Sequence, residues 1–443
     1  MNTDKVKVPK RIAQTILNAL KGGVVPRIGL PYIVVARKNE IATLLHDVDC
    51  ISEGGASFRF IVGRYGSGKS FLIQTIRNNV MSKDFIVSDA DLSPERHLRG
   101  TKGQGLATYR ELINNLSTKT KPEGGALSLI LDRWINNIQS QAVKESGYSL
   151  EDSKLTSLVE KKIFEVTSSI QELVHGFWFA KLLSMYYDAY MIEDNNIKAK
   201  VIRWFKGEYV LKSEVKNDLG INILITDDNW YDYLKIFAKF FRLAGYKGIM
   251  VMIDELVNIY NIPNSVGRHY NYEKILAMYN DVLQGKAKYI GIIMGCTPQA
   301  LEDTKKGIYS YEALRSRLDE NKFSKPGERD LLAPVIRLEA LTQEDMFILC
   351  EKLVDIHSNF YGYESNISEN DIEKFIIIEY QRIGAEQNIT PREVIKDFIG
   401  LLDLTYQYPS KNINYWLNSD EFSFSQSQVI SDNSDDDDIE FEL

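Results

Sequence analysis

The sequence predicts an α/β protein in which a parallel β-sheet is covered by helices, interrupted by a large helical insertion and followed by a C-terminal helical region. Three observations lead to this prediction. Several short segments are almost continuously apolar, as expected for strands buried on both faces of a parallel sheet. One of them runs directly into a glycine-rich loop and a helix. Between residues 106 and 241, apolar residues recur mostly every three or four positions, which is the helical period.

The first elements follow from local patterns. The glycines and proline of GGVVP are expected to end the first helix. The expected helices lie at 10–20, 39–51 and 69–81, the expected strands at 58–63 and 85–92, and a polar loop at 93–105.

After the insertion the apolar runs resume. GIMVMID, KYIGIIMG and APVIRLE are the expected strands at 248–254, 288–295 and 333–339, and helices are expected at 342–357, 369–383 and 391–406. The sequence therefore divides into an N-terminal segment, a first core part, the insertion, a second core part, a helical lid and an acidic tail. These parts cover residues 1–50, 51–105, 106–241, 242–340, 341–411 and 412–443.

The composition is that of a soluble protein, with 44% hydrophobic and 26% charged residues. No apolar run is long enough to span a bilayer and the N-terminus lacks a signal-peptide pattern, so we expect a cytoplasmic protein without membrane association. The three cysteines are widely spaced, which favours reduced thiols. The net charge is −8, and seven acids without a base lie in residues 431–443, so the remainder is nearly neutral.

The glycine-rich loop runs from Gly63 to Ser70 and fits the G-x-x-x-x-G-K-[ST] pattern between a strand and a helix. Backbone N–H groups of such a loop surround phosphates at a helix N-terminus. Lys69 is expected to reach the β- and γ-phosphates of ATP, and the Ser70 hydroxyl to bind Mg²⁺. The alternative is a glycine-rich turn with a fortuitous lysine. The expected nucleotide-binding residues of the loop are Gly63, Gly66, Ser67, Gly68, Lys69 and Ser70.

An acidic pair ends the strand GIMVMID. Asp254 is expected to hold Mg²⁺ through its water shell, and Glu255 to polarise an attacking water. These residues can also be the polar side chains at which a strand meets a loop. Together with the glycine-rich loop, the pair favours a nucleotide site where the ends of parallel strands meet.

Further polar residues follow in the chain. Thr297 ends the next apolar strand and is a candidate contact to the γ-phosphate or the catalytic water, or else a turn residue before proline. Arg315 and Arg317 are candidates for an arginine finger that acts on a neighbouring subunit, or for a solvated helix face. Arg392 lies in a first helical turn, where the helix dipole disfavours a cation, and this suggests a phosphate-sensing role on the lid.

The order of these motifs resembles that of AAA+ ATPases of the origin-recognition and STAND-like group. The segments PYIVVARKNEIATLL, DLSPERHLRG and TPREVIKDF resemble more narrowly the ATP-binding proteins of bacterial BREX phage-defence systems. The resemblance covers most of residues 8–405. It implies a P-loop AAA+-like fold, ATP and Mg²⁺ as ligands, Mg²⁺-dependent ATP hydrolysis, and partners such as a helicase, nuclease or methyltransferase.

Two classes of function stay open. One is an ATP-driven protein, expected to be a homo-oligomer, that acts on DNA within a defence complex. The other is a nucleotide-gated interaction module that recruits an effector with slow or no turnover and without direct DNA contact. A replication-initiator-like loader is disfavoured, because only about forty mostly polar residues follow Leu402. The acidic tail is a solvated disordered segment, a partner hook ending in Ile439, Phe441 and Leu443, or a DNA mimic.

Overall fold

A computed structural model describes residues 8–148, 153–319, 321–323, 329–381 and 390–417. The chain divides into two compact units. Unit 1 contains residues 1–36 and 340–443, and unit 2 contains residues 37–339. The chain therefore passes from unit 1 to unit 2 once and returns once. The sequence pattern alone had not indicated that the first 36 residues share a unit with the C-terminal helices.

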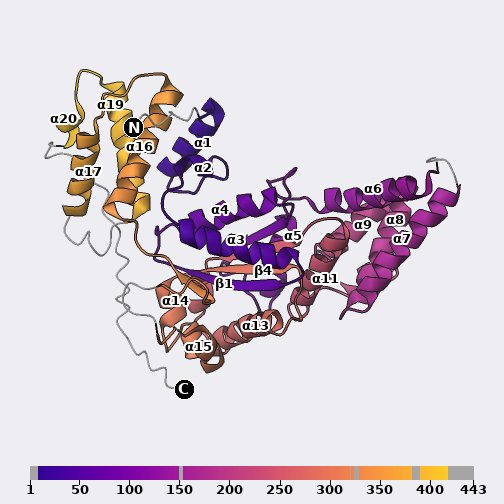
Figure 1. Ribbon diagram of the computed structural model, residues 1–443. Helices are drawn as coiled ribbons and strands as arrows, with labels where there is room; N and C mark the ends of the chain where they lie inside the picture. Colours follow the sequence, from indigo (N-terminus) through magenta and orange to yellow (C-terminus); the bar gives the residue numbers. More distant parts are fainter. Residues whose placement is uncertain (1–7, 149–152, 320, 324–328, 382–389, 418–443) are drawn as a thin grey trace. The chain divides into compact units, whose positions relative to one another are not determined.

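Unit 2 contains a five-stranded parallel sheet, as expected from the apolar runs (Figure 1). Its strands lie in the order β2-β3-β4-β1-β5. Strand β4 lies between β1, which leads into the glycine-rich loop, and β3, which ends at Asp254. The ends of β1 and β3 therefore lie on either side of the end of β4. The strands are β1 (Ala56–Val62), β2 (Ile86–Asp91), β3 (Ile249–Asp254), β4 (Ile290–Cys296) and β5 (Val335–Arg337).

Helices cover both faces of this sheet. Helices α3 (Lys38–Ser52) and α4 (Lys69–Ser82) pack with alternate strand residues, such as Ile61 and Met252, in one hydrophobic cluster. The intervening residues, such as Phe60 and Ile253, pack in the larger cluster with helices of the insertion. Burial on both faces explains why the strands appear in the sequence as continuous apolar runs.

The insertion is helical, as expected. It is built around fully buried aromatic residues, including Trp134, Trp204 and Trp230. Burying side chains of this size provides much of the hydrophobic stabilisation of the insertion. Its helices are α5 (Gln104–Asn114), α6 (Leu127–Ser146), α7 (Ser153–Gln171), α8 (Gly176–Met191), α9 (Asn195–Phe205), α10 (Lys212–Leu219) and α11 (Trp230–Leu243).

The second part of unit 2 alternates strands with helices. Short helices follow β3 and β4 directly, so the polar residues at the strand ends start helical turns. The elements between the strands are α12 (Val257–Tyr260), α13 (Ser265–Leu283), α14 (Pro298–Glu302), the 3₁₀ turn η1 (Ile308–Ser310) and α15 (Glu312–Leu318).

Unit 1 is helical. Its buried His357 contacts Asp403 through Nε2 at 3.1 Å, and Lys21 of the N-terminal segment forms an ion pair with the same aspartate at 2.5 Å. The helices are α1 (Lys10–Lys21), α2 (Leu30–Ile33), α16 (Gln343–Tyr361), α17 (Glu369–Gln381), α19 (Pro391–Gln407) and α20 (Ile413–Leu417).

The segment 412–443, expected from the sequence to be an acidic disordered tail, begins with a short helix. Residues 413–417 form α20, in which Ile413 and Leu417 lie one helical turn apart and are both buried. The acidic run and the candidate hook residues lie outside the described residues. Among the described helices, none combines the length and the apolar character that crossing a bilayer requires.

Candidate functional site

The glycine-rich loop connects β1 to α4 at the end of the sheet where β4 also ends. Gly63 donates its N–H to the Cys296 carbonyl of β4 at 3.1 Å, which fixes the start of the loop. A Cβ at Gly63 would lie 2.4 Å from Ser67 Oγ and 3.4 Å from Lys69 Cγ. Glycine is therefore required for the loop to fold back on itself at this position.

Three features of the loop and of the helix after it suit an anion. Gly68 precedes α4 with φ +93°, and a Cβ there would meet nothing within 4 Å, so the backbone is accessible on that side. The buried hydroxyl of Ser67 has no hydrogen-bond partner among the described residues. A buried polar atom in that state is costly unless a ligand or water satisfies it. The N-terminus of α4, which begins at Lys69, adds a favourable dipole for negative charge.

Lys69 is held against the loop. Its side chain is 8% exposed, and Nζ donates to the Gly63 carbonyl at 2.9 Å and to the Arg64 carbonyl at 3.1 Å. Both acceptors are neutral, and an anionic phosphate is a stronger acceptor for an ammonium group. The lysine therefore lies where it can exchange these contacts for a phosphate.

The two carboxylate oxygens of Asp254 are both fixed. Oδ2 accepts from Ser70 Oγ at 2.9 Å, which joins the end of β3 to the first turn of α4. Oδ1 accepts from the backbone N–H of Glu255 at 2.8 Å. The structure thus brings together Ser70 and Asp254, the two residues expected from the sequence to hold Mg²⁺.

A glycine on the neighbouring strand makes this arrangement possible. Gly295 follows Met294, which pairs with Ile253 in the parallel register of β3 and β4. A Cβ at Gly295 would lie 1.9 Å from Asp254 Oδ1. Any larger residue would therefore displace the carboxylate. Gly295 was not among the site residues expected from the sequence, although a glycine inside an apolar strand is a signal of a close approach.

Glu255 adopts a backbone conformation that is uncommon for a non-glycine residue, with φ +62°. Its carbonyl accepts from the side-chain amide of Asn258 at 3.2 Å, and the same amide donates to the Leu92 carbonyl at 2.9 Å. The Leu92 N–H in turn donates to the Asp254 carbonyl at 3.0 Å. Asn258, which the sequence analysis also missed, therefore supports the turn that carries Glu255.

A further carboxylate lies beside this pair. Asp91 ends β2 and is the register partner of Asp254. Desolvation of its carboxyl, followed by the negative charge of Asp254, raises the pKa of Asp91 above its ordinary value. The same two influences, desolvation and the carboxylates of Glu255 and Asp254, raise the pKa of Tyr65 in the loop. Negative charge therefore accumulates at this edge, which favours a divalent cation.

The residues for a metal are few. Within the described part of the chain, no group of three or more His, Cys, Asp or Glu side chains can hold a metal ion. Mg²⁺ is commonly bound by one or two protein oxygens while water and substrate phosphates complete its shell. Ser70 and Asp254 fit that pattern and do not fit an all-protein metal cage.

Thr297 lies at the end of β4, between the ends of β1 and β3, as its position in the sequence suggested. It is 8% exposed and caps α14, because its Oγ1 accepts from the Ala300 N–H at 3.3 Å. This contact agrees with its role as a turn residue before proline. A contact to a phosphate or catalytic water stays a prediction.

The three candidate arginines are not brought into this group by the described contacts. Arg315 and Arg317 are exposed on α15 of unit 2. Arg392 is exposed in the first turn of α19 in unit 1, between Thr390 and Glu393, which form a capping box. The nearby acid at Glu393 offsets the unfavourable dipole expected for Arg392. The roles of all three arginines remain predictions.

The site can now be compared with known proteins. A model of the family described as BREX system ATP-binding protein BrxC/D matches residues 8–421. The chain belongs to this family. No curated protein matches it. Membership in the BREX ATP-binding family agrees with the resemblance seen in the sequence, and the five-stranded parallel sheet is that of a P-loop ATPase-like fold.

Proposed function

We propose that this BREX-family protein hydrolyses ATP with Mg²⁺ and couples its nucleotide state to the assembly or DNA processing of a phage-defence complex. The observation that carries the proposal is the hydrogen bond between Ser70 and Asp254. Gly295 makes this contact possible, because a side chain there would occupy the space of the Asp254 carboxylate. The hydrogen bond brings together a serine of the glycine-rich loop and an aspartate at the end of β3, the two kinds of residue that hold Mg²⁺ in P-loop NTPases.

Each residue has a distinct role in this proposal. Lys69 and the loop N–H groups bind the phosphates, and Ser70 and Asp254 hold Mg²⁺. When bound, Mg²⁺ neutralises the charge that develops on the transferred phosphoryl group. Glu255 orients the attacking water and accepts its proton. Asn258 holds the backbone of Glu255 through a hydrogen bond to the Glu255 carbonyl.

The proposal extends to partners as the motif order suggests. Arg315 or Arg317 completes the site of a neighbouring copy of the chain, Thr297 contacts the γ-phosphate or the water, and Arg392 links phosphate loss to movement of unit 1. DNA and other defence-system proteins, such as a helicase, nuclease or methyltransferase, are the proposed targets of that movement. A second possibility is a nucleotide-gated module that recruits such an effector without touching DNA.

ATP hydrolysis measured without DNA, with single-stranded DNA and with double-stranded DNA separates these possibilities. We expect Mg²⁺-dependent release of phosphate that DNA increases at least about tenfold, because a protein coupled to DNA uses binding energy to reach its active state. A hydrolysis rate that is the same with and without either form of DNA, together with an oligomeric state that changes on addition of ATP, would favour the nucleotide-gated module. No hydrolysis and no nucleotide binding would reject both.

Substitution of Gly295 by alanine tests the metal site. The added methyl would displace Asp254 Oδ1, so we expect the Mg²⁺ concentration for half-maximal hydrolysis to rise at least about tenfold, with about 1–3 kcal/mol of destabilisation from overpacking. Titration of the ATPase rate with MgCl₂ measures this.

Gly291→Ala is the matched control on the same strand. A Cβ there would meet Met250 Sδ at 2.6 Å and Ile51 Cδ1 at 2.7 Å, which are the ends of flexible apolar side chains. We expect a similar loss of stability and an unchanged Mg²⁺ requirement. A folded Gly295→Ala variant with the wild-type Mg²⁺ requirement would show that Asp254 does not hold the ion.

A further inference from the structure

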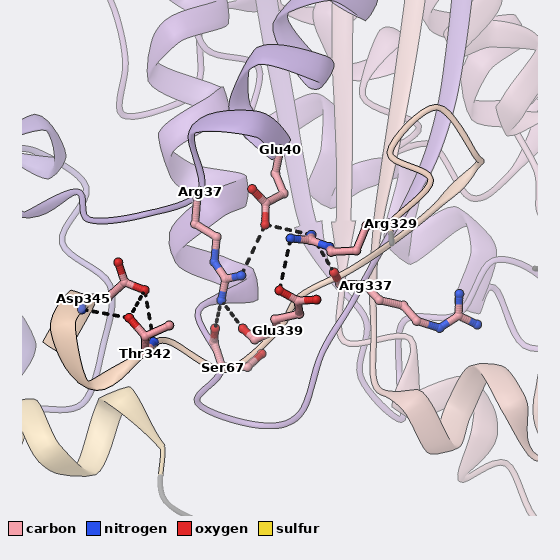
Figure 2. A network of polar contacts seen from close by, with 8 residues as sticks. All are labelled: Arg37, Glu40, Ser67, Arg329, Arg337, Glu339, Thr342 and Asp345. Carbon is pink, nitrogen blue, oxygen red and sulfur yellow. Dashed lines mark hydrogen bonds and ion pairs between the residues drawn. The ribbon is translucent and has the colours of Figure 1, made fainter. Parts of the chain in front are cut away.

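A network of polar contacts lies beside the glycine-rich loop from Gly63 to Ser70, which is called the phosphate loop below. The network involves both passages of the chain between the two units, at residues 36–37 and 339–340. Arg37 is the first residue of unit 2 and Glu339 is its last residue. Figure 2 shows Arg37 directed between the phosphate loop and the segment that follows β5. Its Nη2 donates to the Glu339 carbonyl at 2.5 Å and to the Ser67 carbonyl at 3.4 Å. Arg37, at the first passage, thus contacts both the second passage and the phosphate loop through one nitrogen of its guanidinium.

The guanidinium of Arg37 is held by charged neighbours. Its Nη1 donates to Glu40 Oε1 at 3.3 Å, and Arg329 Nη2 donates to the same oxygen at 2.9 Å. Arg329 also donates to the Arg337 carbonyl at 3.0 Å and forms an ion pair with Glu339 at 3.5 Å. The network therefore joins the start of α3, the end of β5 and the phosphate loop (Figure 2).

The central residues of this network are buried, so their charges must be paired. The Glu40 side chain is 4% exposed and that of Arg37 is 9% exposed. Burial by itself raises the pKa of the Glu40 carboxyl, but the hydrogen bond and charge of Arg329, together with the charge of Arg37, outweigh it and lower the pKa. Glu40 therefore remains a carboxylate and fixes both arginines. A buried carboxylate without these partners would be strongly unfavourable.

The backbone at the first passage is constrained as well. Ala36 and Arg37 both have positive φ, at 54° and 60°, which L-residues adopt singly and seldom in succession. Such a conformation persists only where the surrounding contacts determine it. Here the contacts of the Arg37 side chain hold it, because they attach the passage to Glu339 and to Ser67.

Both passages are short. On the unit 1 side, the Val34 carbonyl accepts from Lys352 of α16 at 2.6 Å, so only two residues separate that anchor from Arg37. On the return passage, only two residues separate Glu339 from Thr342, whose capping box with Asp345 begins α16. Each passage thus leaves only two residues between a residue held within unit 1 and a residue held within unit 2.

We propose that Arg37 is a positioning residue that links the phosphate loop to both chain passages, so that nucleotide binding at the loop orders the connection to unit 1. The proposal rests on the proposed function. The contact to the Ser67 carbonyl is the longest of those that Arg37 makes, and it is the one that a shift of the loop alters first. A loop closed around phosphates shortens it and tightens both passages, and an open loop releases them. Arg37 touches no reacting atom and acts through the backbone.

Hydrogen exchange on the full-length chain, with and without Mg²⁺–ATPγS, tests this link. In the wild type we expect the nucleotide to slow amide exchange in the loop at 63–72 and also in the passage at 335–342. In Arg37→Lys we expect loop protection to remain and passage protection to fall at least about tenfold, since a hydrogen bond to a charged group changes an equilibrium by roughly that factor. Lysine keeps the charge beside Glu40 but lacks the guanidinium fork, whose Nη1 binds Glu40 while its Nη2 donates to the Ser67 and Glu339 carbonyls.

Arg59→Lys is the matched control. Arg59 also binds a carboxylate of α3, at Asp47, and donates to two carbonyls before β5, at Leu332 and Ala333. We expect it to lower the melting temperature about as much as Arg37→Lys while leaving the nucleotide-dependent protection at 335–342 intact. If Arg37→Lys does not fold, the same experiment is done with the double variant Arg37→Met and Glu40→Gln, which removes the buried charges of both residues.

The outcomes are distinguishable. A wild-type chain that binds no ATPγS would reject the proposed function. A wild-type chain whose loop is protected while the passage is unaffected would overturn the link and leave the proposed function intact. If the passage at 335–342 is protected as strongly in Arg37→Lys as in the wild type, the link is also overturned. Loss of nucleotide binding in Arg37→Lys would overturn it too, because Arg37 would then belong to the binding site.

Discussion

Replacement of Lys69 by alanine is expected to abolish ATP binding, with a loss of affinity of at least about 100-fold. The estimate follows from removing an ammonium donor that is expected to make charge-assisted hydrogen bonds to the β- and γ-phosphates, each worth about 1.5–3 kcal/mol. The ammonium group donates to the Gly63 and Arg64 carbonyls of the loop, and Lys69 is nearly buried. Calorimetric titration with Mg²⁺–ATP measures the loss.

Lys83→Ala is the control for this substitution. Lys69 is the first residue of α4, and Lys83 is the residue directly after its last. Lys83 forms a surface ion pair with Asp49 at 2.6 Å. Exposed pairs contribute little to stability, so we expect folding and ATP affinity to be unchanged. We also expect cells carrying Lys69→Ala to lose phage protection and cells carrying Lys83→Ala to keep it. Full protection by Lys69→Ala would remove ATP from the mechanism.

The parts of the site that were predicted from the sequence are those that local patterns determine. The phosphate loop needs glycines and a lysine at fixed spacing, and Asp254 and Glu255 end a strand that is recognisable by its apolar run. Their meeting through Ser70 follows from the parallel sheet, in which strand ends share one edge. The helices of the insertion were predicted for a similar reason, since their apolar period is local.

Features that depend on long-range pairing were not predicted. Gly295 acts on Asp254 only because β3 and β4 pair in one particular register. Arg37 and Glu339 lie at opposite ends of unit 2, so no window of sequence contains both. For the same reason, the shared unit of α1 and α16 could not be recognised from their separate helical patterns. The proposed finger role of Arg315 and Arg317 involves a second copy of the chain, so no pattern within one chain tests it.

Substitution of Glu255 by glutamine is expected to preserve ATP binding and to reduce hydrolysis about 10²–10⁴-fold, the range typical of a general base. Glutamine keeps the size of the side chain and leaves the turn intact, because the turn is held by the backbone of Glu255 through Asp254 and Asn258. Single-turnover hydrolysis, together with calorimetric ATP affinity, separates the two effects. Hydrolysis within about threefold of wild type would exclude Glu255 as the base.

Glu302→Gln provides a carboxylate control from the helix after β4. Glu302 pairs with Arg337 at 3.0 Å near the surface, so its loss should change neither hydrolysis nor binding. The slowly hydrolysing Glu255→Gln variant also holds ATP long enough to measure the mass of its assembly. If Arg315 or Arg317 completes a neighbouring site, ATP should raise that mass, because the bound nucleotide then contacts both copies. A monomer with and without ATP would restrict both arginines to their own chain.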